Sequence, residues 1–164
     1  MMSHESSIQS SKSRNSGLRI SFGGCAALGV YHTGVCKCLT DHAPHLFDEF
    51  EQLYGASAGA FAAAAIVCKC DPTAVYEWLM EMFRTSREYS ILGVVNPSFD
   101  LYSRLRDYIE KIFPTNAHRL CRNRVHISLS VFDSVTRLPR NWLLTDFTTR
   151  KELINVSLMQ TTPR

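Results

Sequence analysis

Apolar and polar residues alternate in two stretches of the chain, at 18–22 and at 125–131. A period of two puts the apolar side chains on one face of a strand, so both stretches are predicted to be strands. A short apolar run that ends at Tyr54 predicts another strand between them. A run at 142–146 predicts a strand that pairs with 125–131 through an intervening turn.

Most of the remaining chain has apolar residues at helical spacing or in an unbroken run. The predicted helices are 30–41, 58–70, 72–88, 99–112 and 149–158. Asp71 and Pro72 provide an N-cap and a first-turn proline for the third of these helices. We interpret the apolar stripes of the third and fourth helices as core packing rather than as lipid-facing surfaces. Strands that alternate with helices predict an α/β fold, here a three-layer sandwich with a largely parallel central sheet.

The length of 164 residues is that of one domain, which we expect to occupy 18–164 after a serine-rich, disordered tail at 1–17. The formal net charge is only +3 and no block of Lys and Arg occurs, which argues against nucleic-acid binding. No apolar run reaches the ~20 residues needed to cross a bilayer. Any membrane contact is therefore expected to be peripheral.

The six cysteines follow no secretory signal, which favours reduced thiols and a cytoplasmic location. They include two Cys-x-Cys pairs, and this spacing differs from the Cys-x-x-Cys of zinc sites. We therefore predict no metal site. Cys36 and Cys68 stand among apolar residues and are interpreted as small hydrophobic side chains.

The sequence Gly-Ala-Ser-Ala-Gly at 55–59 follows a predicted strand and precedes a predicted helix, which is the pattern of a nucleophile elbow. Gly55 and Gly59 allow the chain to turn sharply. The turn exposes the hydroxyl of Ser57 in front of the N-terminal N–H groups of the helix. The pattern indicates ester hydrolysis, and a plain turn of small residues stays the alternative for this pentapeptide alone.

A second small-residue segment, Gly-Cys-Ala-Ala-Leu-Gly at 24–29, also lies between a strand and a helix. Its backbone N–H groups are placed to bind an anion or a reaction oxyanion. A dinucleotide site is disfavoured because Ala26 replaces the glycine that lets a pyrophosphate approach closely. Together with the elbow, the segment predicts an acyl-transfer site, which needs both a serine and preorganised donors.

Four segments, 20–38, 53–68, 96–101 and 123–130, resemble the patatin-like phospholipase family, most closely its adipose triglyceride lipase and adiponutrin branch. The likeness covers about residues 18–156 and is strongest at the motifs Ile-Ser-Phe, Tyr-Gly-Ala-Ser-Ala-Gly and Arg-Val-His-Ile-Ser-Leu.

The resemblance implies a lipid acyl hydrolase that uses a serine–aspartate dyad and no metal or organic cofactor. Ser57 is then the nucleophile, and the oxyanion loop contains Gly24, Cys25, Ala26 and Gly29. The implied substrates are acylglycerols or phospholipids in lipid catabolism, met from the cytoplasm at the surface of a lipid droplet or membrane. A protein coactivator is a further partner that the resemblance allows.

Two departures from the family pattern affect the expected chemistry. Ala26 stands where the family has the central glycine of the loop, and it would strain the backbone by ~1 kcal/mol or more if that position needs a positive φ. The family's catalytic aspartate belongs to an Asp-Gly-Gly or Asp-Gly-Ala motif, and no Asp-Gly dipeptide occurs in the sequence. We expect capping or surface roles for Asp133 and Asp146. We expect structural or exposed roles for the histidines, and His32 is the one to test as a partner of Ser57.

The last residues, 157–164, replace the segment in which the family continues into a further strand. We therefore expect a domain that is shortened at its carboxyl end and lacks its later strands. The alternative to a lipid hydrolase is a catalytically inactive acyl-binding or regulatory fragment without the dyad aspartate.

Overall fold

The computed structural model describes residues 17–96, 98–133 and 135–158. The strands are β1 (Leu18–Phe22), β2 (Phe50–Gly55), β3 (Val125–Phe132) and β4 (Pro139–Leu144). The α-helices are α1 (Val30–His42), α2 (Leu46–Glu49), α3 (Ala58–Val67), α4 (Pro72–Tyr89), α5 (Leu101–Ile112), α6 (Ala117–Cys121) and α7 (Arg150–Ser157). Two short 3-10 helices, η1 (Ala26–Gly29) and η2 (Gly93–Val95), complete the list. The predicted tail lies outside the described residues except for Gly17.

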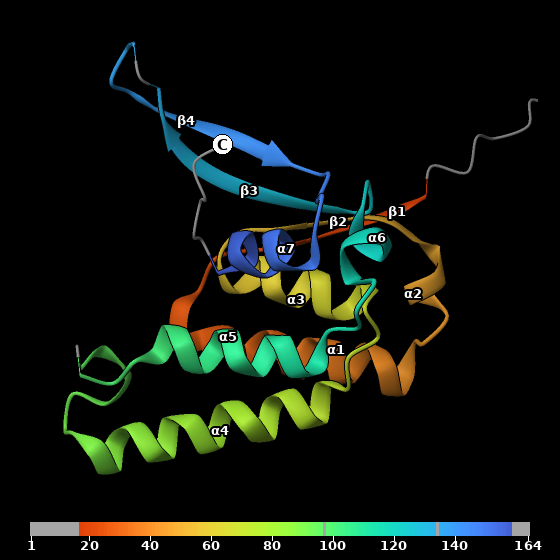
Figure 1. The fold of residues 1–164 in the computed structure, drawn as a ribbon. Helices are drawn as coiled ribbons and strands as arrows, with labels where there is room; N and C mark the ends of the chain where they lie inside the picture. Colours follow the sequence, from red (N-terminus) through yellow and green to blue (C-terminus); the bar gives the residue numbers. More distant parts are fainter. Residues whose placement is uncertain (1–16, 97, 134, 159–164) are drawn as a thin grey trace, which may run out of the picture.

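The four strands form one sheet in the order β1-β2-β3-β4. The pairs β1/β2 and β2/β3 are parallel, and β3/β4 is antiparallel. The structure confirms the predicted α/β class with a largely parallel sheet. Figure 1 shows the helices gathered beneath one face of the sheet, with α3 and α7 next to the strands and α4 farthest away.

The register of the sheet fixes where its strands end. Phe22 of β1 pairs with Gly55 of β2, so these two strands end at the same edge. Gly55 also pairs with Ile127 of β3, and residues 128–132 of β3 continue past it with β4 as their partner. The strand ends and the long β3–β4 hairpin therefore meet at the carboxyl edge of the parallel strands.

Helix α3 packs against the sheet because it is apolar all round. Ala60, Ala63 and Ala64 are fully buried, and small side chains let the helix lie close to the strands. Its neighbours in the core include the buried Leu53 and Ile127. This packing holds the start of α3 against the ends of β1 and β2.

Helices α4 and α5 make a second apolar cluster farther from the sheet. Val75, Leu79 and Met82 of α4 are buried there with Phe99. The structure thus confirms the prediction that these apolar stripes are core. The predicted N-cap is also confirmed, since Asp71 Oδ1 accepts a hydrogen bond of 2.9 Å from the Thr73 N–H.

Element boundaries differ from the sequence-based predictions by two residues or more in three elements. Strand β4 begins at Pro139 and ends at Leu144, earlier than 142–146, because it pairs along the whole extended part of β3. Helix α3 ends at Val67 rather than at 70, and Lys69 then turns the chain with a φ of 56°. Helix α5 begins at Leu101 because Asp100 Oδ1 caps it by accepting from the Ser103 N–H.

Candidate active site

Ser57 occupies a strained turn between β2 and α3. Its φ of 54° and ψ of −127° are a combination that residues with side chains seldom adopt. Ser57 stands at the N-cap position of α3, yet its side chain makes no capping hydrogen bond. A capping serine normally has extended dihedral angles that direct Oγ to the backbone of the first turn. The strained conformation therefore leaves the hydroxyl available for another partner.

The glycines on each side of Ser57 are required by close backbone contacts. A Cβ atom on Gly55 would lie 2.6 Å from Ala60 Cα, and one on Gly59 would lie 2.7 Å from the Gly23 carbonyl oxygen. Both distances are far below van der Waals contact. The Ala56 N–H also donates to the Phe22 carbonyl oxygen at 3.3 Å. The turn is thus locked against the end of β1 and the start of the next loop.

The small-residue segment after β1 lies directly against this turn. A Cβ on Gly24 would be 3.4 Å from Ser57 Cβ, and a Cβ on Gly29 would be 3.2 Å from Ala58 Cβ. The two motifs, about thirty residues apart in the sequence, are therefore adjacent in space. The parallel register of β1 and β2 brings them together, because both motifs follow the ends of neighbouring strands.

Cys25 and Ala26 have different surroundings from the two loop glycines. Ala26 is exposed and has a φ of 46°, so the position does hold the positive φ that favours glycine. The Cys25 Sγ atom lies 3.2 Å from His32 Nε2. Partial burial raises the pKa of the Cys25 thiol, which keeps it neutral near pH 7. Neither side chain forms a hydrogen bond with Ser57, so the loop would act through its backbone.

His32 holds this loop rather than pairing with Ser57. Its Nε2 atom lies 2.9 Å from the Gly23 carbonyl oxygen. Since a carbonyl oxygen only accepts, Nε2 carries the proton and donates it. The His32 ring also packs edge-on against Phe22, with ring centroids 5.3 Å apart. These contacts give His32 a positioning role, in agreement with the structural role expected for the histidines.

The N–H of Ala58 is a donor that the sequence analysis did not single out. As the first residue of α3, Ala58 has no intrahelical acceptor for its N–H. In a nucleophile elbow, the residue after the serine contributes one of the oxyanion donors. Its place in the motif was the signal that would have identified it.

Within the described ranges, no side chain forms a hydrogen bond with Ser57 Oγ. Asp133 accepts from the N–H groups of Val135 and Thr136 in the β3–β4 turn, and the Thr136 N–H lowers the pKa of this carboxyl group. Asp146 forms an exposed ion pair with Arg122 at 2.7 Å. The structure thus confirms the capping and surface roles predicted for the two aspartates.

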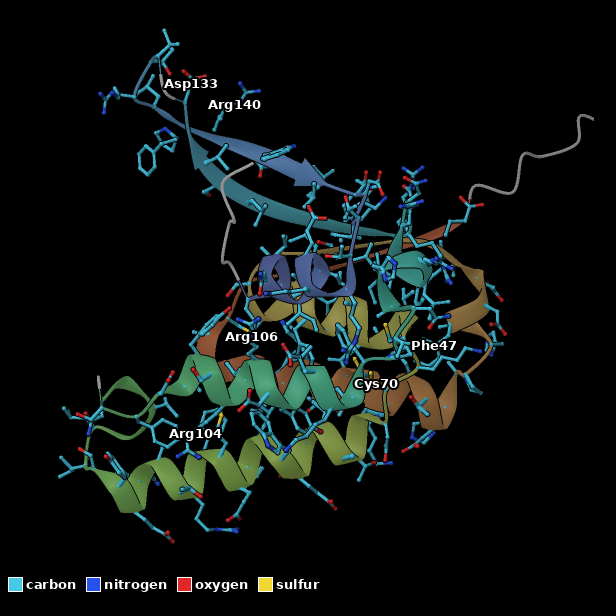
Figure 2. The ribbon with its side chains drawn as sticks, viewed as in Figure 1. Phe47, Cys70, Arg104, Arg106, Asp133 and Arg140 are labelled. Atoms are coloured by element: carbon cyan, nitrogen blue, oxygen red, sulfur yellow. The ribbon has the colours of Figure 1, made fainter. Side chains whose placement is uncertain are left out.

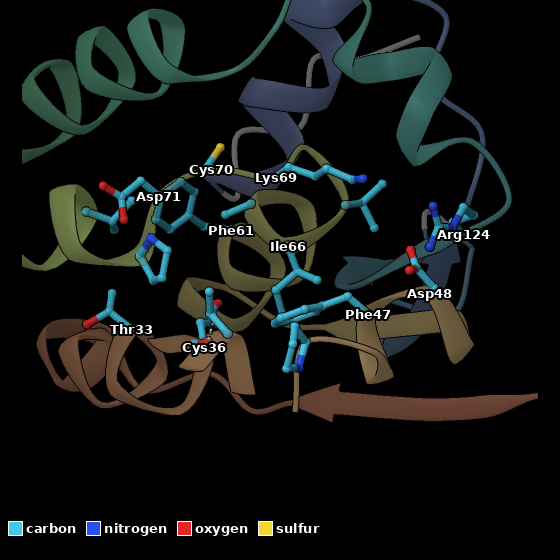
Figure 3. Close-up of a pocket in the computed structure, with 16 residues that line it drawn as sticks. Thr33, Cys36, Phe47, Asp48, Phe61, Ile66, Lys69, Cys70, Asp71 and Arg124 are labelled. Atoms are coloured by element: carbon cyan, nitrogen blue, oxygen red, sulfur yellow. Dashed lines mark hydrogen bonds between the residues drawn. The ribbon is translucent and has the colours of Figure 1, made fainter. Parts of the chain in front are cut away.

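A cavity of about 410 Å³ opens at the opposite end of α3 from Ser57 (Figure 3). Phe47, Phe61 and Ile66 line it together with Cys36, and Lys69 also contributes to its wall. Because Ser57 stands at the start of α3 and the cavity at its end, the two are separate features.

The part of the chain that the structure describes contains no group of His, Cys, Asp and Glu side chains arranged to hold a metal ion. It also contains no helix that is long and apolar enough to cross a membrane. The candidate site consists of Ser57, its flanking glycines and the backbone of the loop at 24–29.

A half-buried serine on a strained strand-to-helix turn, with a glycine-rich loop against it, is an arrangement typical of serine acyl hydrolases. Residues 20–160 match the family Patatin-like phospholipase, and the chain belongs to this family. The comparison with solved structures gave no significant match.

Three curated relatives show how far the similarity extends. Human 1-acylglycerol-3-phosphate O-acyltransferase PNPLA3 is 36% identical over 85% of this chain and 28% of its own length. Bovine patatin-like phospholipase domain-containing protein 2 is 36% identical over 87% of this chain and 28% of its own length. Human patatin-like phospholipase domain-containing protein 4 is 32% identical over 86% of this chain and 54% of its own length. The chain therefore spans between about a quarter and a half of these relatives.

Proposed function

We propose that this chain carries the nucleophile and the oxyanion donors of a lipid acyl hydrolase of the triacylglycerol lipase or phospholipase type. The observation that carries the proposal is the conformation of Ser57. Its positive φ frees the hydroxyl from capping, and the close approach of Gly24 sets the loop backbone beside it. The patatin-like family supplies the lipid ester as the substrate class.

The proposed reaction forms and breaks ester bonds at Ser57. Oγ attacks the acyl carbonyl carbon, and the N–H groups of Ala58 and the loop stabilise the resulting oxyanion. The alcohol leaves with a proton, and water then releases the fatty acid from the acyl-serine and restores the hydroxyl. Transfer to an acylglycerol phosphate, the reaction in the name of one relative, would use the same acyl-serine with a different acceptor.

The proton of Oγ needs a base, and a serine hydroxyl without one is a poor nucleophile at neutral pH. Among the described residues, no acid or histidine forms a hydrogen bond with Ser57 Oγ. The proposal therefore assigns the nucleophile to this chain and requires a carboxylate to approach Ser57 Oγ as its base.

A second candidate function follows from the absence of a hydrogen-bonded base at Ser57 among the described residues. A chain with the acyl-binding surface and an unassisted serine would bind acyl lipids without hydrolysing them, as a regulatory protein. The cavity at the far end of α3 favours this alternative, because its volume of about 410 Å³ and its largely apolar walls are typical of ligand pockets.

A fluorophosphonate probe separates the two functions. Because the hydrolase proposal requires a base at Ser57, it predicts that the 164-residue chain is labelled and that Ser57→Ala abolishes the labelling. Only an activated serine reacts with such probes. Ser130→Ala is the matched control, since Ser130 is exposed on β3 and should not change the labelling. A folded chain that never reacts would contradict the hydrolase proposal and favour the acyl-binding alternative.

A further inference from the structure

The β3–β4 hairpin forms an arm that projects beyond the candidate active site. Strand β2 ends in register with Ile127, and β3 continues for residues 128–132. At ~3.3 Å per residue, five residues extend about 16 Å past the end of β2. Ser57 follows β2 directly, so the arm and the serine lie at the same edge of the sheet. Figure 1 shows the arm reaching away from the helices on this side.

The tip of the arm is folded by its own hydrogen bonds. The Asp133 N–H donates to the Leu138 carbonyl oxygen, and the Arg137 N–H donates to the Asp133 carbonyl oxygen, both at 3.0 Å. The Asp133 carboxylate accepts from two further N–H groups in the turn. These contacts satisfy backbone groups without the help of water, which is the requirement for entering an apolar phase.

The most exposed large apolar side chains gather on this side of the molecule. In the described residues, eight such side chains are at least 58% exposed. We call them the apolar rim, and they are Leu28, Tyr31, Tyr89, Ile91, Leu92, Phe132, Val135 and Leu138. Ile91 is fully exposed, at 100%, and Val135 is 88% exposed.

The apolar rim comes from three segments that lie on the same side of the molecule in Figure 1. Leu28 lies in the oxyanion loop and Tyr31 follows it, and Phe132, Val135 and Leu138 belong to the tip of the arm. The remaining three lie where α4 ends and η2 begins, on the same side as the start of α1 in Figure 1. So many exposed apolar side chains on one side of a molecule are typical of an interaction surface.

The charges of the rim are compatible with an anionic partner. Arg137 at the tip forms no ion pair with any residue that the structure describes. Arg140 lies 3.6 Å from Asp133, and Figure 2 shows this pair at the end of the arm. Since Asp133 is already bound by turn N–H groups and by Arg140, the free charge of the tip is positive. Arginine next to aromatic and aliphatic side chains is typical of surfaces that rest on lipid headgroups.

We propose that the apolar rim docks this protein on a phospholipid surface, with Ser57 facing the lipid. The inference rests on the proposed function, because a lipid ester held in a bilayer or monolayer reaches Ser57 only if this edge of the sheet contacts it. The apolar side chains enter the acyl boundary, and Arg137 contacts anionic headgroups. Three separate segments that protrude at one edge fit a soft lipid surface rather than a groove for one peptide.

Co-sedimentation with vesicles tests the proposal on the 164-residue chain. We use vesicles of phosphatidylcholine alone and of phosphatidylcholine mixed with phosphatidylserine. The double variant Ile91→Ser, Val135→Ser should lower the partition coefficient about tenfold or more on both. Arg137→Gln should weaken binding about fivefold on the mixed vesicles only. The control Tyr76→Ser, Met80→Ser removes two exposed apolar side chains of α4 outside the rim and should bind like the unmodified chain.

Three results would overturn the proposal: no binding of the unmodified chain to either vesicle, an equal loss in the rim and control variants, or a lipid-free dimer that the rim variant converts to a monomer. The last result, measured by sedimentation velocity, would show that a second copy covers the rim. Because the rim side chains are exposed, circular dichroism should show all variants folded.

Measuring vesicle binding and probe labelling on the same chain separates this proposal from the proposed function. Vesicle binding that persists in a chain which never reacts with the fluorophosphonate probe supports docking and contradicts hydrolysis. Probe labelling without vesicle binding contradicts docking alone.

Discussion

The elbow at Ser57 and the loop at Ala26 both place a residue other than glycine at a positive φ, of 54° and 46° respectively. Their surroundings are opposite. The elbow is enclosed, since Gly55 and Gly59 have backbone atoms where a Cβ would be. Ala26 is exposed, and the loop around it is held by the His32 hydrogen bond to Gly23. The same backbone strain is thus fixed by packing in one case and by the polar contacts of His32 with Gly23 and Cys25 in the other.

This difference matters for catalysis because each half of the site needs a fixed geometry. Strain of about 1–3 kcal/mol persists only where the surrounding structure determines the backbone. The elbow meets this condition through contacts from β1, β2 and α3. The loop at 24–29 is fixed by fewer contacts than the elbow. We therefore expect the positions of its N–H donors to vary more than the position of Ser57.

The largest effect should come from adding one methyl group to the elbow. Gly59→Ala would push a Cβ against the Phe22 and Gly23 carbonyl groups, which are backbone and cannot move aside. We expect the free energy of unfolding to fall by about 3 kcal/mol or more, measured by urea denaturation. Gly34→Ala is the control, because a Cβ at that position in α1 meets nothing within 4 Å. It should stabilise the helix by about 0.5–1 kcal/mol. Equal effects of the two substitutions would show that the elbow is not tightly enclosed.

A smaller effect is expected where one hydrogen bond holds the loop. His32→Ala removes the donor to the Gly23 carbonyl oxygen and should lower the free energy of unfolding by about 1 kcal/mol. Amide hydrogen exchange at 23–26 should become faster, while exchange in α3 stays unchanged. His42→Ala, at the exposed end of the same helix, is the control and should leave the loop unaffected. Unchanged exchange at 23–26 would mean that packing, not His32, holds the loop.

Sequence patterns predicted the elbow better than they predicted the contacts that hold the loop beside it. The spacing of Gly55, Ser57 and Gly59 encodes a local turn, and local turns are visible in the sequence. The neighbouring strand register is also implied by alternating strands and helices. The contact of His32 with Gly23 depends on how α1 packs beside β1, which no local pattern encodes. The contact of His32 with Gly23 was therefore not predicted from the sequence.

The β3–β4 hairpin also has features that local sequence patterns did not predict. The alternation at 125–131 predicted β3 but not that it runs past β2, because strand length relative to a neighbour is set by pairing. The start of β4 at Pro139 was missed since proline is a weak strand signal, although it is tolerated at the first position of an edge strand. The exposed tip therefore became visible only in the structure.

The smallest effect, and the most direct measure of loop strain, comes from two adjacent alanines. Ala26→Gly relieves the positive φ but also adds unfolded-state entropy, while Ala27→Gly adds the entropy alone because Ala27 has an ordinary φ. Both side chains are exposed, so neither substitution removes buried contacts. We expect Ala26→Gly to be more stable than Ala27→Gly by about 1 kcal/mol in urea denaturation. If the strain weakens the oxyanion donors, Ala26→Gly should also raise any esterase or fluorophosphonate rate. Equal stabilities would show that Ala26 costs the loop nothing, and an unchanged rate would mean that the loop already holds its donors in place.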